Sequence, residues 1–244
     1  MKRVKRESQL YPLVRTWLER RGHHVGRDLF RIAGKGRARP RPWENVGLSD
    51  TRFDVIGVRS VGSPHHDEVE IVAVEVKLTN RVRVQHLNQA VGYMRFVDRA
   101  YFAFTGEYEP DVIDEARRVG IGLLAVSPSG RPKVRVILDA ALGAPHPNRR
   151  VTLLHALWIH RCALCGAYFF AFTHPDTAGP RNPNWIPLKR ESGLPRRPDG
   201  EGKFEAVLCE ECGPLLGYVR VKQGSGTRWK FQGGVGHVFG SDHR

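Results

Sequence analysis

The 244-residue chain carries 39 Lys and Arg residues against 25 Asp and Glu residues, a formal net charge of +14. Hydrophobic residues make up 41% of the chain, which is enough for a packed core and excludes disorder along the whole length. No run of about 18 apolar residues is present, so no membrane span is expected. The basic N-terminus lacks the apolar stretch of a signal peptide, and we expect a cytoplasmic protein.

The basic excess extends along the chain, because a cut at Asp139 leaves a positive balance on both sides. Such a balance favours a polyanionic partner, since Lys and Arg displace the counterions condensed on phosphates. Solubility, or an Arg-rich genome, is the alternative explanation. The charge therefore indicates nucleic acid as a partner without establishing it.

The first part of the chain alternates helix and strand patterns. Apolar residues recur at helical spacing between Glu7 and Arg21, with Pro12 favouring a late start, and 25–32 is a candidate strand. Residues 33–42, rich in Gly, Arg and Pro, are expected to form a basic loop. The elements that follow are strands at 52–58 and 69–78, a helix at 84–97, a strand at 100–104, a helix at 110–119, and strands at 121–126 and 134–138.

This order predicts an α/β domain over residues 1–140, with a mixed central sheet flanked by helices. The composition then changes, and residues 141–152, which contain Gly and Pro, are interpreted as a linker. Residues 153–244 carry the four cysteines in two pairs. They are expected to form a second, smaller and β-rich domain.

Two of the predicted strands carry charged residues inside apolar runs. Glu75 and Lys77 are two residues apart, so both side chains project from one face while Val76 packs into the core. Asp54 interrupts the other strand, where a lone carboxylate is costly unless it is paired or bound to a metal. If the strands are neighbours, Asp54 and Glu75 converge on one cation with Lys77 beside it. Metal-assisted phosphodiester cleavage needs such hard oxygen ligands and a nearby positive charge.

These residues, on elements in this order, resemble the PD-(D/E)xK nuclease superfamily, which includes many restriction enzymes, Holliday-junction resolvases and recombination exonucleases. The resemblance covers about Glu7 to Leu138, and Phe53 in place of the proline is a common departure. It implies a restriction-endonuclease-like fold with Asp54 and Glu75 as ligands of Mg²⁺ or Mn²⁺. It also implies Lys77 as the residue that positions the attacking water and steadies the pentavalent phosphate.

The resemblance implies further site residues. Some members place an acidic residue on the first helix, where this chain has Glu7. One branch has a Gln-x-x-x-Tyr pattern on the helix after the lysine strand, which Gln89 and Tyr93 match. Simpler interpretations stay open: an ion pair at a solvated sheet edge for the strand residues, a first-turn carboxylate favoured by the helix dipole for Glu7, and a helix face packed on the sheet for Gln89 and Tyr93.

The four cysteines form two Cys-x-x-Cys-Gly motifs, at Cys162 and Cys165 and at Cys209 and Cys212. Two residues between thiolates let both sulfurs reach one ion, and the glycine permits a tight turn with backbone amides near the sulfurs. Two such pairs complete a closed, tetrahedral site for structural Zn²⁺. The arrangement resembles zinc-ribbon domains. The alternative is a set of reducible dithiols, which would not call for both glycines.

Basic and aromatic residues outside these motifs are candidate nucleic-acid contacts. Trp185, between the two cysteine pairs, either stacks on a base or packs its ring against the ribbon. The candidates are Lys35, Arg37, Arg39, Arg81, Arg83, Tyr93, Trp185, Lys189, Arg190, Arg196 and Arg197.

Together these features predict a Mg²⁺-dependent nuclease that hydrolyses DNA, as an endonuclease or a structure-selective, resolvase-like enzyme, with a zinc module that aids binding. Two other classes stay open: a nucleic-acid-binding protein on an inactive nuclease fold, and a protein-interaction module built on the zinc ribbon. Resolvases and many restriction enzymes pair to cut two strands, so by analogy alone a homodimer stays open too. The sequence does not distinguish DNA from RNA, or a duplex from a junction or a single strand.

Overall fold

The structure is a computed structural model, in which the chain divides into two compact units. The first unit comprises residues 1–62 and 69–156, and the second unit comprises residues 63–68 and 157–244. Among the described residues, no helix is long and apolar enough to cross a membrane. The structure describes residues 4–26, 42–48, 50–61, 68–128, 133–170, 185–188, 206–209, 212–216, 218–223 and 226–231.

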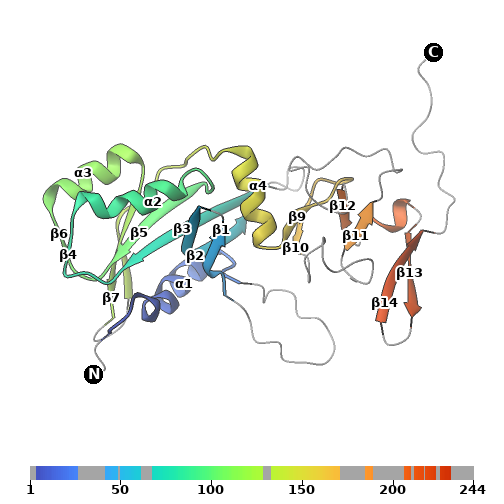
Figure 1. The fold of residues 1–244 in the computed structure, drawn as a ribbon, viewed down its shortest axis with the longest axis horizontal. Helices are drawn as coiled ribbons and strands as arrows, with labels where there is room; N and C mark the ends of the chain where they lie inside the picture. Colours follow the sequence, from blue (N-terminus) through green and yellow to red (C-terminus); the bar gives the residue numbers. More distant parts are fainter. Residues whose placement is uncertain are drawn as a thin grey trace, which may run out of the picture. The chain divides into compact units, whose positions relative to one another are not determined.

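A six-stranded mixed sheet forms the centre of the first unit (Figure 1). The strand order is β1-β2-β3-β5-β7-β8, with β3, β5 and β7 parallel and the other neighbours antiparallel. Strand β3 is buried along almost its whole length, as expected for a central strand covered on both faces. The strands are β1 (Glu44–Leu48), β2 (Thr51–Ser60), β3 (Val69–Lys77), β5 (Arg99–Phe104), β7 (Gly122–Ser127) and β8 (Lys133–Leu138).

Helices cover both faces of this sheet (Figure 1). Val14 and Leu18 of α1 are fully buried in one core cluster with Val74 of β3. Helix α2 lies against the opposite face, because its Tyr93 contacts Glu75, and neighbouring residues of a strand point to opposite sides. The helices are α1 (Tyr11–Arg20), α2 (Asn88–Tyr93), α3 (Pro110–Val119) and α4 (Pro147–Ala156), with 3₁₀ turns η1 (Glu7–Gln9) and η3 (Val84–Leu87).

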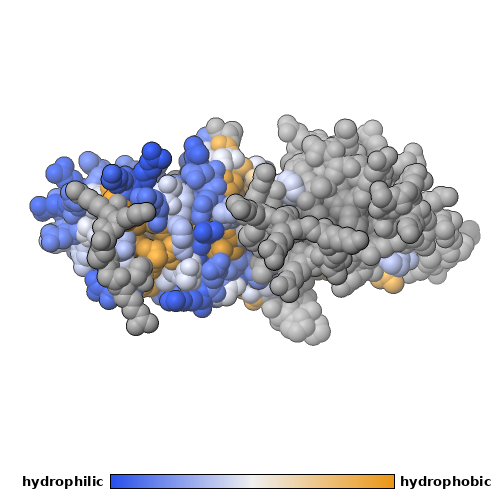
Figure 2. Space-filling model, turned by 90° about the horizontal axis from the view of Figure 1, so that it is seen from below, coloured by the Kyte–Doolittle hydropathy of each residue, from blue (hydrophilic) through white to orange (hydrophobic). Residues whose placement is uncertain are grey.

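A short parallel pair, β4 (Arg81–Val82) and β6 (Glu107–Tyr108), lies outside the main sheet. In Figure 2 the described surface of the first unit is mostly hydrophilic, with small apolar areas between polar ones. Helix α4 ends the first unit, and its Leu153 and Leu154 are buried. The segment 141–152, interpreted from its composition as a linker, thus ends inside a helix.

The second unit contains three two-stranded antiparallel sheets in its described part. A small core joins Leu208 to three of the cysteines, and Leu164 and Phe169 pack against it. The strand pairs are β9 (Ile159–Arg161) with β10 (Tyr168–Phe170), β11 (Trp185–Leu188) with β12 (Ala206–Cys209), and β13 (Tyr218–Gln223) with β14 (Gly226–Phe231), and a 3₁₀ turn, η6, spans Pro214–Leu216.

The predicted fold class, a mixed sheet flanked by helices together with a small β-rich part, is confirmed. The helix predicted at 84–97 is shorter than expected, because η3 covers its start and α2 already ends at Tyr93. Strand β1 was not predicted. The strand predicted at 25–32 and the basic loop at 33–42 lie almost wholly outside the described residues; Gly26 forms an isolated bridge with Pro42.

Candidate active site and metal centre

The candidate site lies where β2 and β3 separate. The pairing between these strands ends at Val55 and Val74, whereas β3 continues beside β5 as far as Lys77. Beyond that point the N–H of Val76 donates a hydrogen bond to Oδ2 of Asp54, at 2.8 Å. The side chain of Asp54 therefore accepts the hydrogen bond that a backbone carbonyl of a neighbouring strand would otherwise accept. The two predicted strands are neighbours, which the convergence of Asp54 and Glu75 requires.

Glu75 is a buried carboxylate with a partner on each oxygen. Only 1% of the residue is exposed. The Tyr93 hydroxyl donates a hydrogen bond to Oε2, and the Lys77 ammonium lies 2.9 Å from Oε1. Burial and then the negative charge of Asp54 raise the pKa of Glu75, although Tyr93 and Lys77 act in the opposite direction. An ion pair at a solvated sheet edge, the simpler interpretation of these residues, does not fit so buried a carboxylate.

Asp54 is held on both oxygens as well. The Tyr11 hydroxyl donates a hydrogen bond to Oδ1 at 2.8 Å, opposite the bond from Val76 to Oδ2. Burial and the contact with Asp54 raise the pKa of Tyr11, so that its hydroxyl stays protonated and remains a donor. The sequence analysis missed Tyr11. Its signal was a polar ring on the buried side of the first helix, since a buried tyrosine hydroxyl usually has a hydrogen-bond partner.

Lys77 connects the carboxylates to the N-terminal part of the chain. Its ammonium lies 3.8 Å from Oε1 of Glu7, which also accepts a hydrogen bond from the Leu78 N–H at 3.4 Å. Burial lowers the pKa of Lys77, but the carboxylates of Glu75, Glu7 and Asp54 outweigh it and raise the pKa above its ordinary value. The lysine is therefore cationic at neutral pH. Glu7, expected on the first helix, lies in η1 just before α1.

Other predicted site residues lie apart from this cluster. Gln89 is exposed on α2, and none of the contacts described for the cluster includes it. Arg81 and Arg83 are mostly exposed and share the Glu109 carboxylate, with their Nε atoms 3.2 and 3.6 Å from its Oε1. Tyr93, proposed as a nucleic-acid contact, is 2% exposed, which favours the alternative of a helix face packed on the sheet.

Most of the predicted basic contacts fall on parts of the chain that the structure does not describe. The backbone of Trp185 belongs to β11, and its side chain is outside the description. The residues outside the described ranges are Lys35, Arg37, Arg39, Lys189, Arg190, Arg196 and Arg197.

The donors at the candidate active site fit a hard divalent cation. Asp54 and Glu75 offer carboxylate oxygens, and a divalent cation held by both would relieve their mutual repulsion. Glu7 is not a third converging ligand. Among the described residues, the cysteine cluster is the one group of three or more His, Cys, Asp or Glu side chains whose ligand atoms all lie within 4.8 Å of one another.

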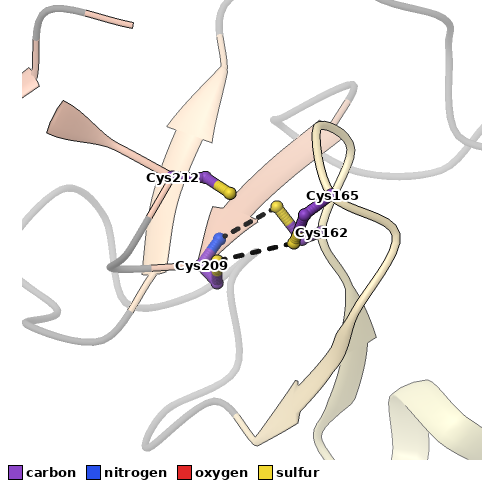
Figure 3. Close-up of side chains that lie close together, drawn as sticks. All are labelled: Cys162, Cys165, Cys209 and Cys212. Carbon is purple, nitrogen blue, oxygen red and sulfur yellow. Dashed lines mark hydrogen bonds between the residues drawn. The ribbon is translucent and has the colours of Figure 1, made fainter. Parts of the chain in front are cut away.

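The four cysteines predicted as a metal site come together in the second unit (Figure 3). All four are free thiols, with the sulfurs of Cys165 and Cys209 3.9 Å apart and the Cys209 N–H 3.4 Å from the Cys162 sulfur. Cys162, Cys209 and Cys212 are buried and Cys165 is exposed. Four sulfurs converging from two motifs fit a closed tetrahedral Zn²⁺ site, and no disulfide joins them.

Backbone amides support this cluster. Gly166 adopts a φ of 77°, which favours glycine, and its N–H donates to the Cys162 carbonyl at 3.0 Å. Burial raises the pKa of the Cys162 thiol, but the backbone amides of Cys165, Cys209 and Leu164 outweigh it and lower the pKa below its ordinary value. These amides favour the thiolate of Cys162, the form that binds a metal, whereas burial raises the pKa of Cys209 and of Cys212.

Comparisons with known proteins add no family assignment, because no family model and no curated protein matches the chain. Three solved structures are similar to parts of it. SPO1766, a protein of unknown function from Silicibacter pomeroyi, is 21% identical over 47% of this chain and 68% of its own, with a TM-score of 0.32.

The MspJI restriction endonuclease, solved with a 27-mer oligonucleotide, is 18% identical over 49% of this chain, with a TM-score of 0.33. SfsA of Pyrococcus furiosus, solved with Ca²⁺, is 15% identical over 41% of this chain, with a TM-score of 0.24. The match spans 25% of the MspJI chain and 54% of the SfsA chain. Similarity at these identities and TM-scores supports no conclusion about function, so the proposed function is based on the residues of the site.

Proposed function

We propose that the first unit is a metal-dependent nuclease that hydrolyses phosphodiester bonds in DNA. The observation that supports this most directly is the gathering of Asp54, Glu75 and Lys77 where β2 and β3 separate. Each carboxylate is also held by a tyrosine hydroxyl from a helix on a different face of the sheet. Such support orients ligands before an ion arrives, as the partners around metal ligands commonly do.

Asp54 and Glu75 hold the ion in this proposal. A buried carboxylate beside a second negative charge is destabilised, which favours binding of a divalent cation. When bound, Mg²⁺ or Mn²⁺ lowers the pKa of its water and offsets the charge of the scissile phosphate. The residues thus supply hard oxygens in a fixed position, which is the chemistry that such an ion requires.

Lys77 steadies the negative charge that develops on the phosphate and orients the attacking water. Its side chain is 28% exposed, so the ammonium reaches a substrate at the surface of the unit. Contacts with Glu75 and Glu7 limit where the ammonium can move. A charge already in place at the reacting group is more effective than one that must reorganise.

The competing class, a binding protein on an inactive nuclease fold, is less well supported. It predicts that at least one member of the carboxylate–lysine set is missing, but all three are present: Lys77 pairs with Glu75, and Asp54 accepts a hydrogen bond from the Val76 N–H between them. For the second unit we propose a structural Zn²⁺ on the cysteine cluster and a role in holding nucleic acid. That role rests on the net charge of +14. Choice of DNA over RNA, a cytoplasmic location and pairing into a homodimer remain predictions.

The test is a cleavage assay with Mg²⁺, Mn²⁺ or EDTA on supercoiled plasmid, linear duplex, single-stranded DNA and a four-way junction. We expect metal-dependent cleavage by the wild-type protein and its loss in Asp54→Asn and Lys77→Ala, with DNA binding retained. Asp114→Asn is a matched control, because this aspartate is exposed on α3. Tight, salt-sensitive binding without cleavage would support the inactive class, and wild-type turnover by Lys77→Ala would remove the lysine from the mechanism.

A further inference from the structure

A polar cavity of about 300 Å³ lies in the first unit, away from the candidate active site. It is lined by three arginines, two carboxylates and a buried histidine: Arg21, Arg59, Arg99, Glu70, Asp139 and His23. Glu70 stands near the start of β3, and Glu75 is five residues further on, roughly 17 Å along a strand. The two residues also point to opposite faces of the sheet. The cavity and the candidate active site are therefore separate.

Glu70 fixes two of the guanidinium groups. It is 6% exposed and accepts hydrogen bonds from Nε of Arg59 at 2.5 Å and from Nε of Arg99 at 2.8 Å. One terminal nitrogen of each arginine donates to a backbone carbonyl, of Arg21 and Ala140 respectively. The described contacts engage Nε and one terminal nitrogen of each guanidinium group. A guanidinium group has five N–H donors, so these contacts do not exhaust the donors of either arginine.

The third arginine belongs to an aromatic wall of the cavity. The Arg21 guanidinium lies 4.6 Å from the ring centroid of Trp17 and 3.3 Å from the Asp139 carboxylate. The Tyr101 hydroxyl donates to the same carboxylate at 2.7 Å, and the Trp17 and Tyr101 rings meet edge to face, 5.1 Å apart. Asp139 is thereby engaged by two donors. The Trp17 ring and the Asp139 carboxylate both contact the Arg21 guanidinium.

His23 adds an unsatisfied polar group. Its side chain is 4% exposed, and among the described residues neither ring nitrogen has a hydrogen bond of normal geometry; Nε2 lies 3.4 Å from Oε2 of Glu70, and Glu70 and the Leu18 backbone act only weakly on the ring. Burial, followed by the charge of Arg59, lowers the pKa of His23, so the ring is neutral and offers one donor and one acceptor. Buried polar atoms without partners are uncommon in folded proteins, and this one lines a cavity.

The charges of the lining residues favour an anion. Three guanidinium groups face two carboxylates, and each carboxylate already accepts bonds from two of the lining side chains. The lining is thus net positive, with spare planar donors of the kind that bind phosphate oxygens. A volume of about 300 Å³ is at the lower end of small-molecule pockets, which suits a phosphate group with a small substituent.

We propose that this cavity binds a small phosphate monoester. This proposal does not rest on the proposed nuclease function, because the cavity lies at the other face and the other end of β3. Inorganic phosphate, a free mononucleotide and the 5′-phosphorylated end of a nucleic-acid strand share the chemistry that the cavity recognises. The source of the phosphate is therefore decided by comparing these three.

The test is isothermal titration of the full-length, zinc-loaded protein without Mg²⁺ and at constant ionic strength. The probes are inorganic phosphate, deoxyadenosine 5′-monophosphate, and one oligodeoxynucleotide with and without a 5′-phosphate. We expect saturable binding at one site per chain. A preference for the mononucleotide indicates a free nucleotide as ligand, and a gain from the 5′-phosphate on the oligonucleotide indicates a strand end.

Variants distinguish phosphate binding at a specific site from nonspecific attraction of an anion to a basic protein. Arg59→Gln and Arg21→Ala should each weaken phosphate binding by about tenfold or more, because a charge-assisted bond to the anion is lost. Arg117→Ala is the matched control, since this arginine forms a surface ion pair with Asp114 on α3 and lies outside the cavity lining. Arg21 is 39% exposed on its side chain, so Arg21→Ala is expected to fold even if Arg59→Gln does not.

Two outcomes would overturn the proposal: no saturable binding of any phosphate probe, or affinity equal to that of wild type in both cavity variants. Either one would leave the arginines and carboxylates as an ion-pair network that stabilises the fold. Cleavage activity is measured separately on the same proteins, so failure of the cavity proposal is distinguishable from failure of the nuclease proposal.

Discussion

Single residues decide how the two carboxylates of the candidate active site are presented. Tyr11 and Tyr93 donate to Asp54 and Glu75 from opposite faces of the sheet, while Lys77 bonds to Glu75 from the same strand. Neither tyrosine carries a charge. Their contribution is to orient carboxylate oxygens, so their removal should alter metal binding more than folding.

Tyr11→Phe tests this directly. The variant keeps the ring in the core and removes the donor to Asp54, and we expect the apparent affinity for Mg²⁺ or Mn²⁺ to fall about tenfold or more. The measurement is cleavage rate against metal concentration. Tyr108→Phe, an exposed tyrosine on β6, is the control. Equal metal dependence in wild type and Tyr11→Phe would show that the Asp54 contact does not orient the ligand.

In the metal-free protein, ionisation of Glu75 makes the free energy of unfolding depend on pH. Its pKa is raised in the folded chain, chiefly by burial and then by Asp54, so the folded state holds this proton more tightly than the unfolded state. Stability from this group is therefore fully present at low pH and is lost as pH rises through its folded pKa. Glu75→Gln should remove that loss and make the metal-free protein at least as stable as wild type at neutral pH.

Urea unfolding of wild type and Glu75→Gln in metal-free buffer, from pH 4 to about pH 8, measures this difference. Added Mg²⁺ should stabilise the wild-type protein at the upper end of this pH range, because the ion binds the ionised carboxylate. It should leave the stability of the variant unchanged. A variant less stable than wild type at every pH would mean that the Lys77 and Tyr93 contacts outweigh the burial of the charge.

The candidate site residues could be predicted from sequence where they interrupt an apolar strand or form a known metal-binding motif. Asp54, Glu75 and Lys77 interrupt apolar strands, and the four cysteines have the spacing of metal knuckles. Tyr11 breaks no pattern, because a tyrosine suits the buried side of a helix. Its role depends on which hydroxyl reaches Asp54 from an element 43 residues away, and local sequence carries no information on that pairing.

Among the elements, those with local boundary signals or an apolar run were predictable, the edge strand β8 included, whereas the edge strand β1 and helix α4 were not. The helix at 110–119 has proline at its first turn and Gly120 in the left-handed conformation at its end, so both boundaries are encoded locally. Within the described part of the chain, strand β1 pairs with β2 alone, and it is half buried to exposed along its length. Its short sequence therefore shows little of the alternation that marks a strand.

Arg150 joins helix α4 to the rest of the first unit by partly buried hydrogen bonds. Arg150 donates to the Asp98 carboxylate and to the Val69 carbonyl, with 20% and 14% of the Arg150 and Asp98 side chains exposed. Asp98 also accepts a hydrogen bond from the Ile71 N–H at 2.7 Å, so it ties α4 to the start of β3. The neighbouring Arg149 pairs with Asp50 at the surface, where the side chains are 37% and 50% exposed.

Replacing these neighbours one at a time separates a structural contact from a surface ion pair. Arg150→Ala should lower the free energy of unfolding by roughly 1–3 kcal/mol, because Oδ1 of Asp98 and the Val69 carbonyl lose the Arg150 donor. Arg149→Ala should change it by about 1 kcal/mol or less. Urea unfolding of both variants measures the difference. Similar losses in the two would indicate that α4 is held by its buried leucines alone.

At the scale of the whole molecule, we expect the two units to depend on different sources of stability. The first unit has an apolar core between α1 and the sheet. In the described part of the second unit, one core cluster joins Leu208 to three cysteines, and Leu157 and Ile159 are also buried. A metal bound by these cysteines would contribute its binding free energy only to the folded chain.

Zinc removal should therefore unfold the second unit while the first unit remains folded. We expect about one zinc per chain by elemental analysis, and its loss in Cys209→Ser, since three ligands bind less tightly than four. In calorimetry, a chelator or Cys209→Ser should remove the transition of the second unit and leave that of the first unit in place. Cys209 is the informative position because its sulfur lies beside that of Cys165 and its N–H points at Cys162. If a chelator leaves a cooperative melt unchanged and elemental analysis finds no zinc, the four cysteines are free thiols and the zinc assignment is wrong.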